Sequence, residues 1–265
     1  MRLAILGFIV CATIGCKSVP SWHHVSSLSL DGINPLGLAS IGDELWVSDS
    51  DHNQLVRLDA SGKILGYETD FDRPMHITGY ATSLYVPEYG KDQITVVNAS
   101  REALSLIDSL DAPAAVDVSD GVYAIADFYN HRIIYGSGED WISMGKEGQA
   151  RGELYYPTDV QIYEDEIYVA DAYNNRVQVF GTDGRYRRLF GVNEEINAAT
   201  GLYVHDGEVF VTDFENDRVI IYSTDGNLIQ ILEEGIKKPS DLVWFQDRLY
   251  LANYKGKNLM IYKKR

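Results

Sequence analysis

The stretch YPTDVQIYEDEIYVADAYNNRVQVFGTDG, residues 156–184, carries the signals that decide the fold. A proline opens a short alternating segment, and an apolar run with one aromatic residue then ends at Asp171. A polar loop leads to a second apolar run, which ends at a Thr-Asp-Gly turn. β-Branched and aromatic residues between such turn residues are typical of short strands. The stretch therefore predicts three consecutive antiparallel strands and a fourth after the turn.

The same pattern occurs six times along the chain, with an acidic or amide anchor residue at one fixed place. Successive anchors are 39, 39, 44, 42 and 40 residues apart. Five of the seven prolines lie 14 residues before an anchor, and Ala199 takes that place in the fifth copy. Units of about 40 residues with four strands are typical of β-propeller blades. The anchors are Asp49, Glu88, Asp127, Asp171, Asp213 and Asn253.

The two ends of the repeat region predict a closed ring. The last copy ends after its third strand, and residues 25–30, ahead of the first copy, alternate like a strand. Pairing these segments completes the last blade and removes exposed strand edges. We therefore predict an all-β fold, a six-bladed β-propeller of four-stranded blades over residues 23–265. Its ring is closed by an N-terminal strand that pairs with the last blade.

The N-terminus is predicted to be a targeting segment. Residues 3–15 form an apolar run of 13 residues, too short to span a bilayer, and Arg2 precedes it. The run ends at Gly15-Cys16, as in a bacterial lipobox, although Thr13 stands where Leu is usual. We predict a signal peptide over residues 1–15, lipid attachment (such as palmitate) at Cys16 and a linker to residue 22. The alternative is ordinary secretion, with Cys16 cut away or left free.

This assignment predicts an exported protein, anchored by lipid to the bacterial cell envelope at the outer membrane and facing the periplasm or the surface. Both cysteines, Cys11 and Cys16, lie ahead of the repeats, so residues 23–265 can form no disulfide. The net charge of −16, from 23 basic and 39 acidic residues, argues against nucleic acid as a partner. We expect a monomer that contacts the membrane only through its anchor.

The repeats resemble the NHL repeat family of six-bladed β-propellers, over essentially residues 23–265. Copies three to five carry that family's Asp-to-Arg spacing, whereas Gln54, Gln93 and Asn258 replace the arginine elsewhere. The resemblance implies the fold and no single function, because relatives include binding scaffolds, RNA binders, sensor domains and a zinc lyase. Similar six-bladed rings serve as calcium-dependent lactonases. The lyase's histidines are missing here, since the positions after the proline hold Leu36, Met75, Ala114, Thr158, Thr200 and Ser240.

The second residue after each proline is expected to rim the mouth of the central channel, because the innermost strand lines the channel in such propellers. The polar residues at this position fall in alternate blades and are His76, Asp159 and Asp241. A histidine with two carboxylates is an acceptable set of ligands for a catalytic divalent cation. The alternative is that the aspartates cap loops or bind channel water. We expect no other cofactor.

The loops after the anchors place aromatic side chains on one face of the ring. Such side chains suit contacts with sugars, peptides or proteins, or they cover neighbouring loops. The candidate binding rim comprises Tyr89, Phe128, Tyr129, Tyr173, Phe214 and Tyr254.

No P-loop, nucleophile-elbow or zincin motif occurs in the sequence, so no catalytic set is evident. The sequence therefore favours a lipid-anchored envelope module that binds a protein, peptide or glycan through this rim. The alternative is a metal-dependent hydrolase or lactonase with its site at the channel mouth. A structural lipoprotein without a small ligand is the third possibility.

Overall fold

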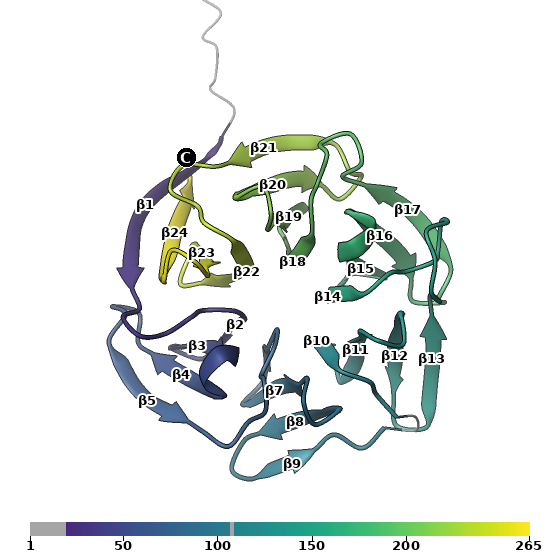
Figure 1. The fold of residues 1–265 in the computed structure, drawn as a ribbon, viewed down its shortest axis with the longest axis horizontal. Coiled ribbons are helices and arrows are strands. Elements are labelled where there is room, and N and C mark those ends of the chain that lie inside the picture. The colour runs from purple at the N-terminus through teal and green to yellow at the C-terminus, as the bar shows by residue number, and fades with distance from the viewer. Residues whose placement is uncertain (1–19, 107–108) are drawn as a thin grey trace, which may run out of the picture.

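The computed structural model describes residues 20–106 and 109–265, and it confirms the predicted six-bladed β-propeller. Six four-stranded antiparallel sheets stand around a central axis (Figure 1). The predicted signal peptide and the lipid-attachment residue Cys16 lie outside the described residues. Within those residues, no helix is long and apolar enough to cross a membrane.

The blades are numbered in chain order, and the strands of each are given from the channel outward. Blade 1 holds β2 (Leu38–Ile41), β3 (Glu44–Asp49), β4 (Gln54–Leu58) and β5 (Ile64–Glu68). Blade 2 holds β6 (Thr78–Tyr80), β7 (Ser83–Glu88), β8 (Gln93–Val97) and β9 (Arg101–Ala103). Blade 3 holds β10 (Pro113–Ser119), β11 (Val122–Asp127), β12 (Arg132–Ser137) and β13 (Asp140–Met144).

The second half of the ring repeats this plan. Blade 4 holds β14 (Pro157–Tyr163), β15 (Glu166–Asp171), β16 (Arg176–Gly181) and β17 (Tyr186–Phe190). Blade 5 holds β18 (Ala199–His205), β19 (Glu208–Asp213), β20 (Arg218–Ser223) and β21 (Leu228–Leu232). Blade 6 holds β22 (Pro239–Phe245), β23 (Arg248–Asn253), β24 (Asn258–Lys264) and β1 (Trp22–Ser29). Two single-turn 3-10 helices follow anchors, η1 (Ser50–His52) and η2 (Ala172–Asn174).

The ring closes as predicted, because β1 pairs antiparallel with β24 and becomes the outer strand of blade 6. The register runs from Trp22 opposite Lys264 to Ser29 opposite Asn258. The Trp22 indole is buried, and its Nε1 donates a hydrogen bond to Glu208 of blade 5 at 3.0 Å. The closing strand thus pairs with one blade and is fixed to the next.

The core lies between the blades, where the apolar faces of neighbouring sheets pack together. Tyr168 of blade 4, for example, is fully buried against Val204 and Val209 of blade 5. Phe210 and Leu249 meet in the same way between blades 5 and 6. Each sheet is therefore stabilised mainly by its neighbours.

The anchor side chains tie consecutive blades together. In blades 2 to 6 each anchor accepts a hydrogen bond from the backbone N–H of the residue 16 positions earlier, at 2.5–2.8 Å. In blades 3 to 5 the anchor also receives the Nε–H of the arginine five residues later, at 2.6–2.7 Å. Asp and Asn fix turns in this manner, so the repeated acids are structural. In blades 2 to 6 the strand register places the anchor opposite the proline position, as in Pro157 opposite Asp171.

Candidate functional site

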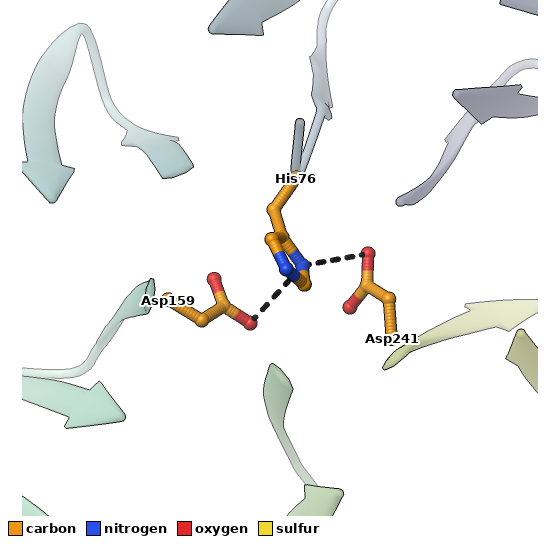
Figure 2. A group of neighbouring side chains, drawn as sticks. All are labelled: His76, Asp159 and Asp241. Carbon is orange, nitrogen blue, oxygen red and sulfur yellow. Dashed lines mark ion pairs between the residues drawn. The ribbon is translucent and has the colours of Figure 1, made fainter. Parts of the chain in front are cut away.

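His76, Asp159 and Asp241 converge at the centre of the ring, and we call them the channel triad (Figure 2). They come from blades 2, 4 and 6, and their ligand atoms all lie within 4.8 Å of one another. The Nδ1 atom of His76 is 3.5 Å from Asp241 Oδ2 and 3.9 Å from Asp159 Oδ2. Among the described residues, this is the one group of three histidine, cysteine or carboxylate side chains with metal-binding spacing.

Backbone hydrogen bonds orient both carboxylates of the triad. Asp159 Oδ2 accepts the N–H of Leu202 in blade 5 at 2.7 Å, and Asp241 Oδ2 accepts the N–H of Leu38 in blade 1 at 2.7 Å. The other oxygen of each carboxylate accepts the N–H of the residue that follows it. Each aspartate therefore joins its own strand to the next blade, as the capping alternative expects. The oxygens that face His76 keep a second lone pair for another partner.

Two glycines keep this layer of the channel narrow. A Cβ atom added to Gly201 would lie 2.1 Å from the carbonyl oxygen of Ser240, and one added to Gly37 would lie 2.5 Å from that of Met75. Neither position can accept a side chain without moving a neighbouring strand. The channel triad and Ala115 are thus the residues that fill this layer.

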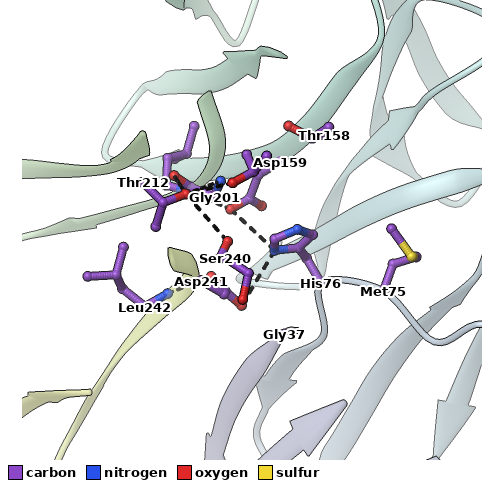
Figure 3. A network of polar contacts seen from close by, with 12 residues as sticks. Gly37, Met75, His76, Thr158, Asp159, Gly201, Thr212, Ser240, Asp241 and Leu242 are labelled. Carbon is purple, nitrogen blue, oxygen red and sulfur yellow. Dashed lines mark hydrogen bonds and ion pairs between the residues drawn. The ribbon is translucent and has the colours of Figure 1, made fainter. Parts of the chain in front are cut away.

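Hydroxyl groups satisfy the backbone beside the triad (Figure 3). Thr212 Oγ1 accepts the N–H of Gly201 at 2.7 Å, and Ser240 Oγ donates to the carbonyl of Pro35 at 3.1 Å. This network holds the inner ends of blades 5, 6 and 1 together. The triad is therefore supported by a rigid, hydrogen-bonded layer.

Burial and mutual proximity control the charge of the triad. Burial raises the pKa of Asp159, and the neighbouring Asp241 carboxylate adds to this effect, whereas His76 opposes it. Burial opposes the charged form of His76, but Asp159 and Asp241 outweigh it and raise the pKa of the imidazole. Within the described structure, His76 Nδ1 is buried and has no hydrogen-bond partner. Two carboxylates at such short range need protons or a bound cation to neutralise them.

A cavity of about 260 Å³ begins at the triad. It is lined by residues that follow the triad along the innermost strands. The residues directly after the prolines do not line it, so the cavity extends from the triad away from the prolines. The triad residues are only 4–5% exposed. They therefore lie inside the channel, at one end of this cavity, whereas the sequence predicted a position at the rim of the channel mouth.

A second polar layer lines the cavity two residues beyond the triad positions. It includes Asp117, whose Oδ2 accepts the N–H of Ile162 at 2.8 Å and whose pKa is raised by burial. Tyr203 lies in the same layer, and burial raises the pKa of its hydroxyl to about 12. The sequence analysis missed both residues. The two-residue period of the strands, applied once more to the channel positions, finds them.

The candidate rim divides into two separate parts. Tyr89, Phe128, Tyr129 and Tyr173 contact one another over blades 2 to 4, with ring centroids 5.1–6.4 Å apart. Phe214 and Tyr254 form a second pair over blades 5 and 6, at 6.3 Å. Tyr129 and Tyr173 are 48% and 61% exposed, so the larger part is open to solvent.

Three further residues join the larger part, and sequence analysis missed them. The Tyr156 ring lies 4.8 Å from Phe128 and 4.9 Å from Tyr173, and the Tyr155 ring stacks on His131 at 5.2 Å. The signal was the Tyr155-Tyr156 pair just ahead of Pro157. We call these residues, with the four above, the aromatic cluster. Many of its rings cover one another, while two remain largely exposed.

Comparison with known proteins places the fold. The NHL repeat model matches residues 154–180. No curated protein sequence matches the chain. Among solved structures, a gluconolactonase from Xanthomonas campestris superposes with a TM-score of 0.69 and 15% identity, over 93% of this chain and 100% of that one. Virginiamycin B lyase from Staphylococcus aureus gives a TM-score of 0.67 and 12% identity, over 92% and 99%.

A chain of the nidogen/laminin complex is also similar, with a TM-score of 0.64 and 14% identity over 75% of this chain and 80% of that one. At such low identities the likeness concerns the fold alone. Two of these similar structures are enzymes by title and one is a binding complex, so shared architecture does not select a function. The repeat match and the closed ring together identify the chain as a six-bladed β-propeller that carries an NHL repeat.

Proposed function

We propose that the protein is a hydrolase that uses a divalent cation in its channel and acts on small esters or lactones. The observation that carries this proposal is the convergence of the three triad ligand atoms within 4.8 Å in a buried layer. The buried His76 Nδ1, which finds no hydrogen-bond partner in the described structure, fits a metal ligand. One imidazole and two carboxylates suit zinc or manganese and leave coordination positions open.

The chain would supply position, orientation and shape. His76, Asp159 and Asp241 would hold the ion, and the N–H groups of Leu202 and Leu38 keep the carboxylates turned towards it. A bound cation would polarise a substrate carbonyl and lower the pKa of a coordinated water towards ~7. The Tyr203 hydroxyl lines the cavity and is protonated at neutral pH, so it can donate a hydrogen bond to a substrate there.

The first experiment is elemental analysis of the full chain after chelation and reconstitution with zinc or manganese. We expect about one ion per chain, and loss of the ion in an Asp159→Asn/Asp241→Asn double variant. Asp117→Asn is the matched control, because Asp117 lines the same cavity but lies outside the triad. If ion content is equal in the parent and the double variant, the channel is not a metal site. Hydrolysis of aryl esters and lactones by the loaded protein tests the activity.

A second candidate function is a binding module for a protein, peptide or glycan on the loop face, and the exposed part of the aromatic cluster supports it. A Tyr129→Ala/Tyr173→Ala variant is expected to lose partner capture from envelope extracts with an unchanged melting temperature. Phe214→Ala/Tyr254→Ala, on the other part of the rim, is the control. If the Tyr129→Ala/Tyr173→Ala variant captures the partner as well as the control variant and the parent do, the aromatic cluster is not the binding surface.

We further propose that the protein is lipid-anchored through Cys16, which rests on the sequence pattern alone. The expected result is that the parent fractionates with membranes and Cys16→Ser does not. Identical fractionation of the two proteins would contradict the anchor.

A further inference from the structure

A second cavity, of about 490 Å³, lies between blades 1 and 2, and we call it the blade 1–2 cleft. Ile41, Trp46, Leu84 and Val97 give it apolar lining, whereas Arg57 and Arg101 bring two guanidinium groups. Cavities that bind small molecules commonly combine such a volume and apolar surface with a few polar groups. The cleft is separate from the channel, because the two share no lining residue.

Arg57 is the unusual residue of the cleft. Its guanidinium lies over the Trp46 ring at 5.5 Å, and its nearest carboxylate oxygen, on Glu44, is 4.0 Å away. Its guanidinium makes no hydrogen bond to any residue in the described part of the chain, and its Nε is buried there without an acceptor. The indole Nε1 of Trp46 is likewise buried and lacks a partner among the described residues. Donors left unpaired in a protein interior are unfavourable, so this place suits an added acceptor.

Blade 4 holds a comparable group of side chains in which the arginine, here on the fourth strand instead of the third, has its acceptors. Glu166 and Tyr168 open β15 at the places that Glu44 and Trp46 hold in β3. Arg188 donates two hydrogen bonds to Glu166, at 2.5 and 2.6 Å, and a third to the Tyr168 hydroxyl at 2.9 Å. Its Nε donates to the carbonyl of Thr224 in blade 5 at 2.9 Å. The Arg188 guanidinium thus makes four hydrogen bonds, whereas that of Arg57 makes none to the described residues.

The residue opposite Arg57 has no side chain, which leaves room for the guanidinium. Arg57 pairs across the sheet with Gly66 of β5, and a Cβ atom at Gly66 would lie 3.3 Å from Arg57 Nη2. Arg57 remains 34% exposed and lines the cleft, so a ligand can reach it. The second arginine, Arg101, is held by the carbonyl of Thr69 at 2.7 Å and by Glu68 at 3.4 Å.

We propose that the blade 1–2 cleft binds a small organic carboxylate, whose two oxygens give Arg57 the acceptors that Arg188 has in Glu166 and Tyr168. The planar guanidinium fork matches a carboxylate in bidentate geometry. The carboxylates of Glu44 and Glu68 also line the cleft and disfavour a dianion such as phosphate. The apolar lining favours an acid with an apolar body over a bare anion.

The test is titration of the full chain at pH 7 with benzoate and with benzamide, its uncharged analogue, followed by calorimetry and tryptophan fluorescence. We expect saturable benzoate binding near ~1 mM, the range for so small a ligand, and benzamide at least ~10-fold weaker. Arg57→Gln should weaken benzoate ~10-fold, because it removes the charged fork. Arg185→Gln, an exposed arginine of blade 4, is the control for the lost charge and should leave binding unchanged.

A second variant separates charge from position. Gly66→Ala keeps Arg57 but crowds its guanidinium, so benzoate should weaken several-fold while the melting temperature stays the same. Absence of saturable benzoate binding up to about 20 mM would overturn the proposal. So would equal affinity for benzamide, or an Arg57→Gln variant that binds like the parent. Inorganic phosphate that displaces benzoate at equal concentration would show a general anion site and overturn the carboxylate assignment.

Discussion

Blades 1 and 4 each bring a glutamate, an aromatic ring and an arginine to the same level of the sheet, yet only in blade 4 does the arginine hydrogen-bond to the other two. In blade 4 the Tyr168 hydroxyl accepts from Arg188 and donates to Glu166 at 2.9 Å, so one atom joins both partners. Blade 1 has an indole there, and the indole N–H can only donate. Trp46 therefore cannot accept from Arg57, and the set stays open. A repeat thus determines where side chains stand, while the chemistry of one ring decides whether a junction between blades is closed or can take a ligand.

The largest expected effect comes from breaking the closed set. Glu166→Ala removes the two strongest acceptors of Arg188 and leaves the Tyr168 hydroxyl without its acceptor. We expect a loss of about 2 kcal/mol in the free energy of unfolding, because a partly buried charged network loses its carboxylate. The matched Glu44→Ala variant in blade 1 should cost less than about 0.5 kcal/mol. Urea unfolding of both variants measures the difference, and equal losses would remove the contrast between the blades.

The pH dependence of stability provides a second comparison, with opposite signs for two carboxyl groups. The Arg188 guanidinium lowers the pKa of Glu166, so its contribution is present above pH 4.5 and is lost as the pH falls further. Burial raises the pKa of Asp117, so the folded state holds that proton more tightly than the unfolded chain does. Its contribution is therefore present below about pH 4 and is lost as the pH rises through the raised pKa.

Unfolding of Glu166→Gln and Asp117→Asn, each compared with the parent between pH 4 and 8, tests both signs. The free energy of unfolding of the parent should rise with pH relative to that of Glu166→Gln, and it should fall with pH relative to that of Asp117→Asn. Two differences with the same slope would contradict the assigned environments.

The smallest expected effect comes from a substitution that gives blade 1 the tyrosine of blade 4. Trp46→Tyr supplies a hydroxyl that can accept from Arg57 and donate to Glu44, as Tyr168 does with its partners. We expect benzoate affinity to fall about three-fold, because Arg57 then has an acceptor within the protein. Trp46→Phe, which lacks the hydroxyl, controls for the lost ring volume. Equal benzoate affinity in the two variants would show that the hydroxyl does not engage Arg57.

The sequence predicts the ring and the triad for one reason, which is that both follow the repeat. The proline and anchor positions mark each blade. Because side chains alternate along a strand, the second residue after the proline faces the channel. The repeat does not predict in which direction the cavity extends. That direction depends on the sizes of the side chains in each layer, which set the width of the channel there. For that reason His76 was expected at the rim of the mouth and is instead buried at one end of the channel cavity.

The blade 1–2 cleft escapes prediction for a different reason. Arg57 stands on the third strand of its blade, whereas Arg188 stands on the fourth strand of blade 4, so no repeat position links them. Their equivalence appears only when the strands are paired and the two arginines reach the same level of the sheet. The aromatic cluster shows the same limit, since Tyr155 and Tyr156 meet Tyr173 across a loop that the repeat leaves variable.

The closure of the ring has a consequence in time. The pairing of β1 with β24 joins Ser29 to Asn258, which lie 258 − 29 = 229 positions apart. At typical synthesis rates that interval lasts roughly 10 to 50 s, during which the first strand has no partner while the middle blades can already stack. The last blade can form only when its third strand has been made, so the ring stays open for most of its own synthesis.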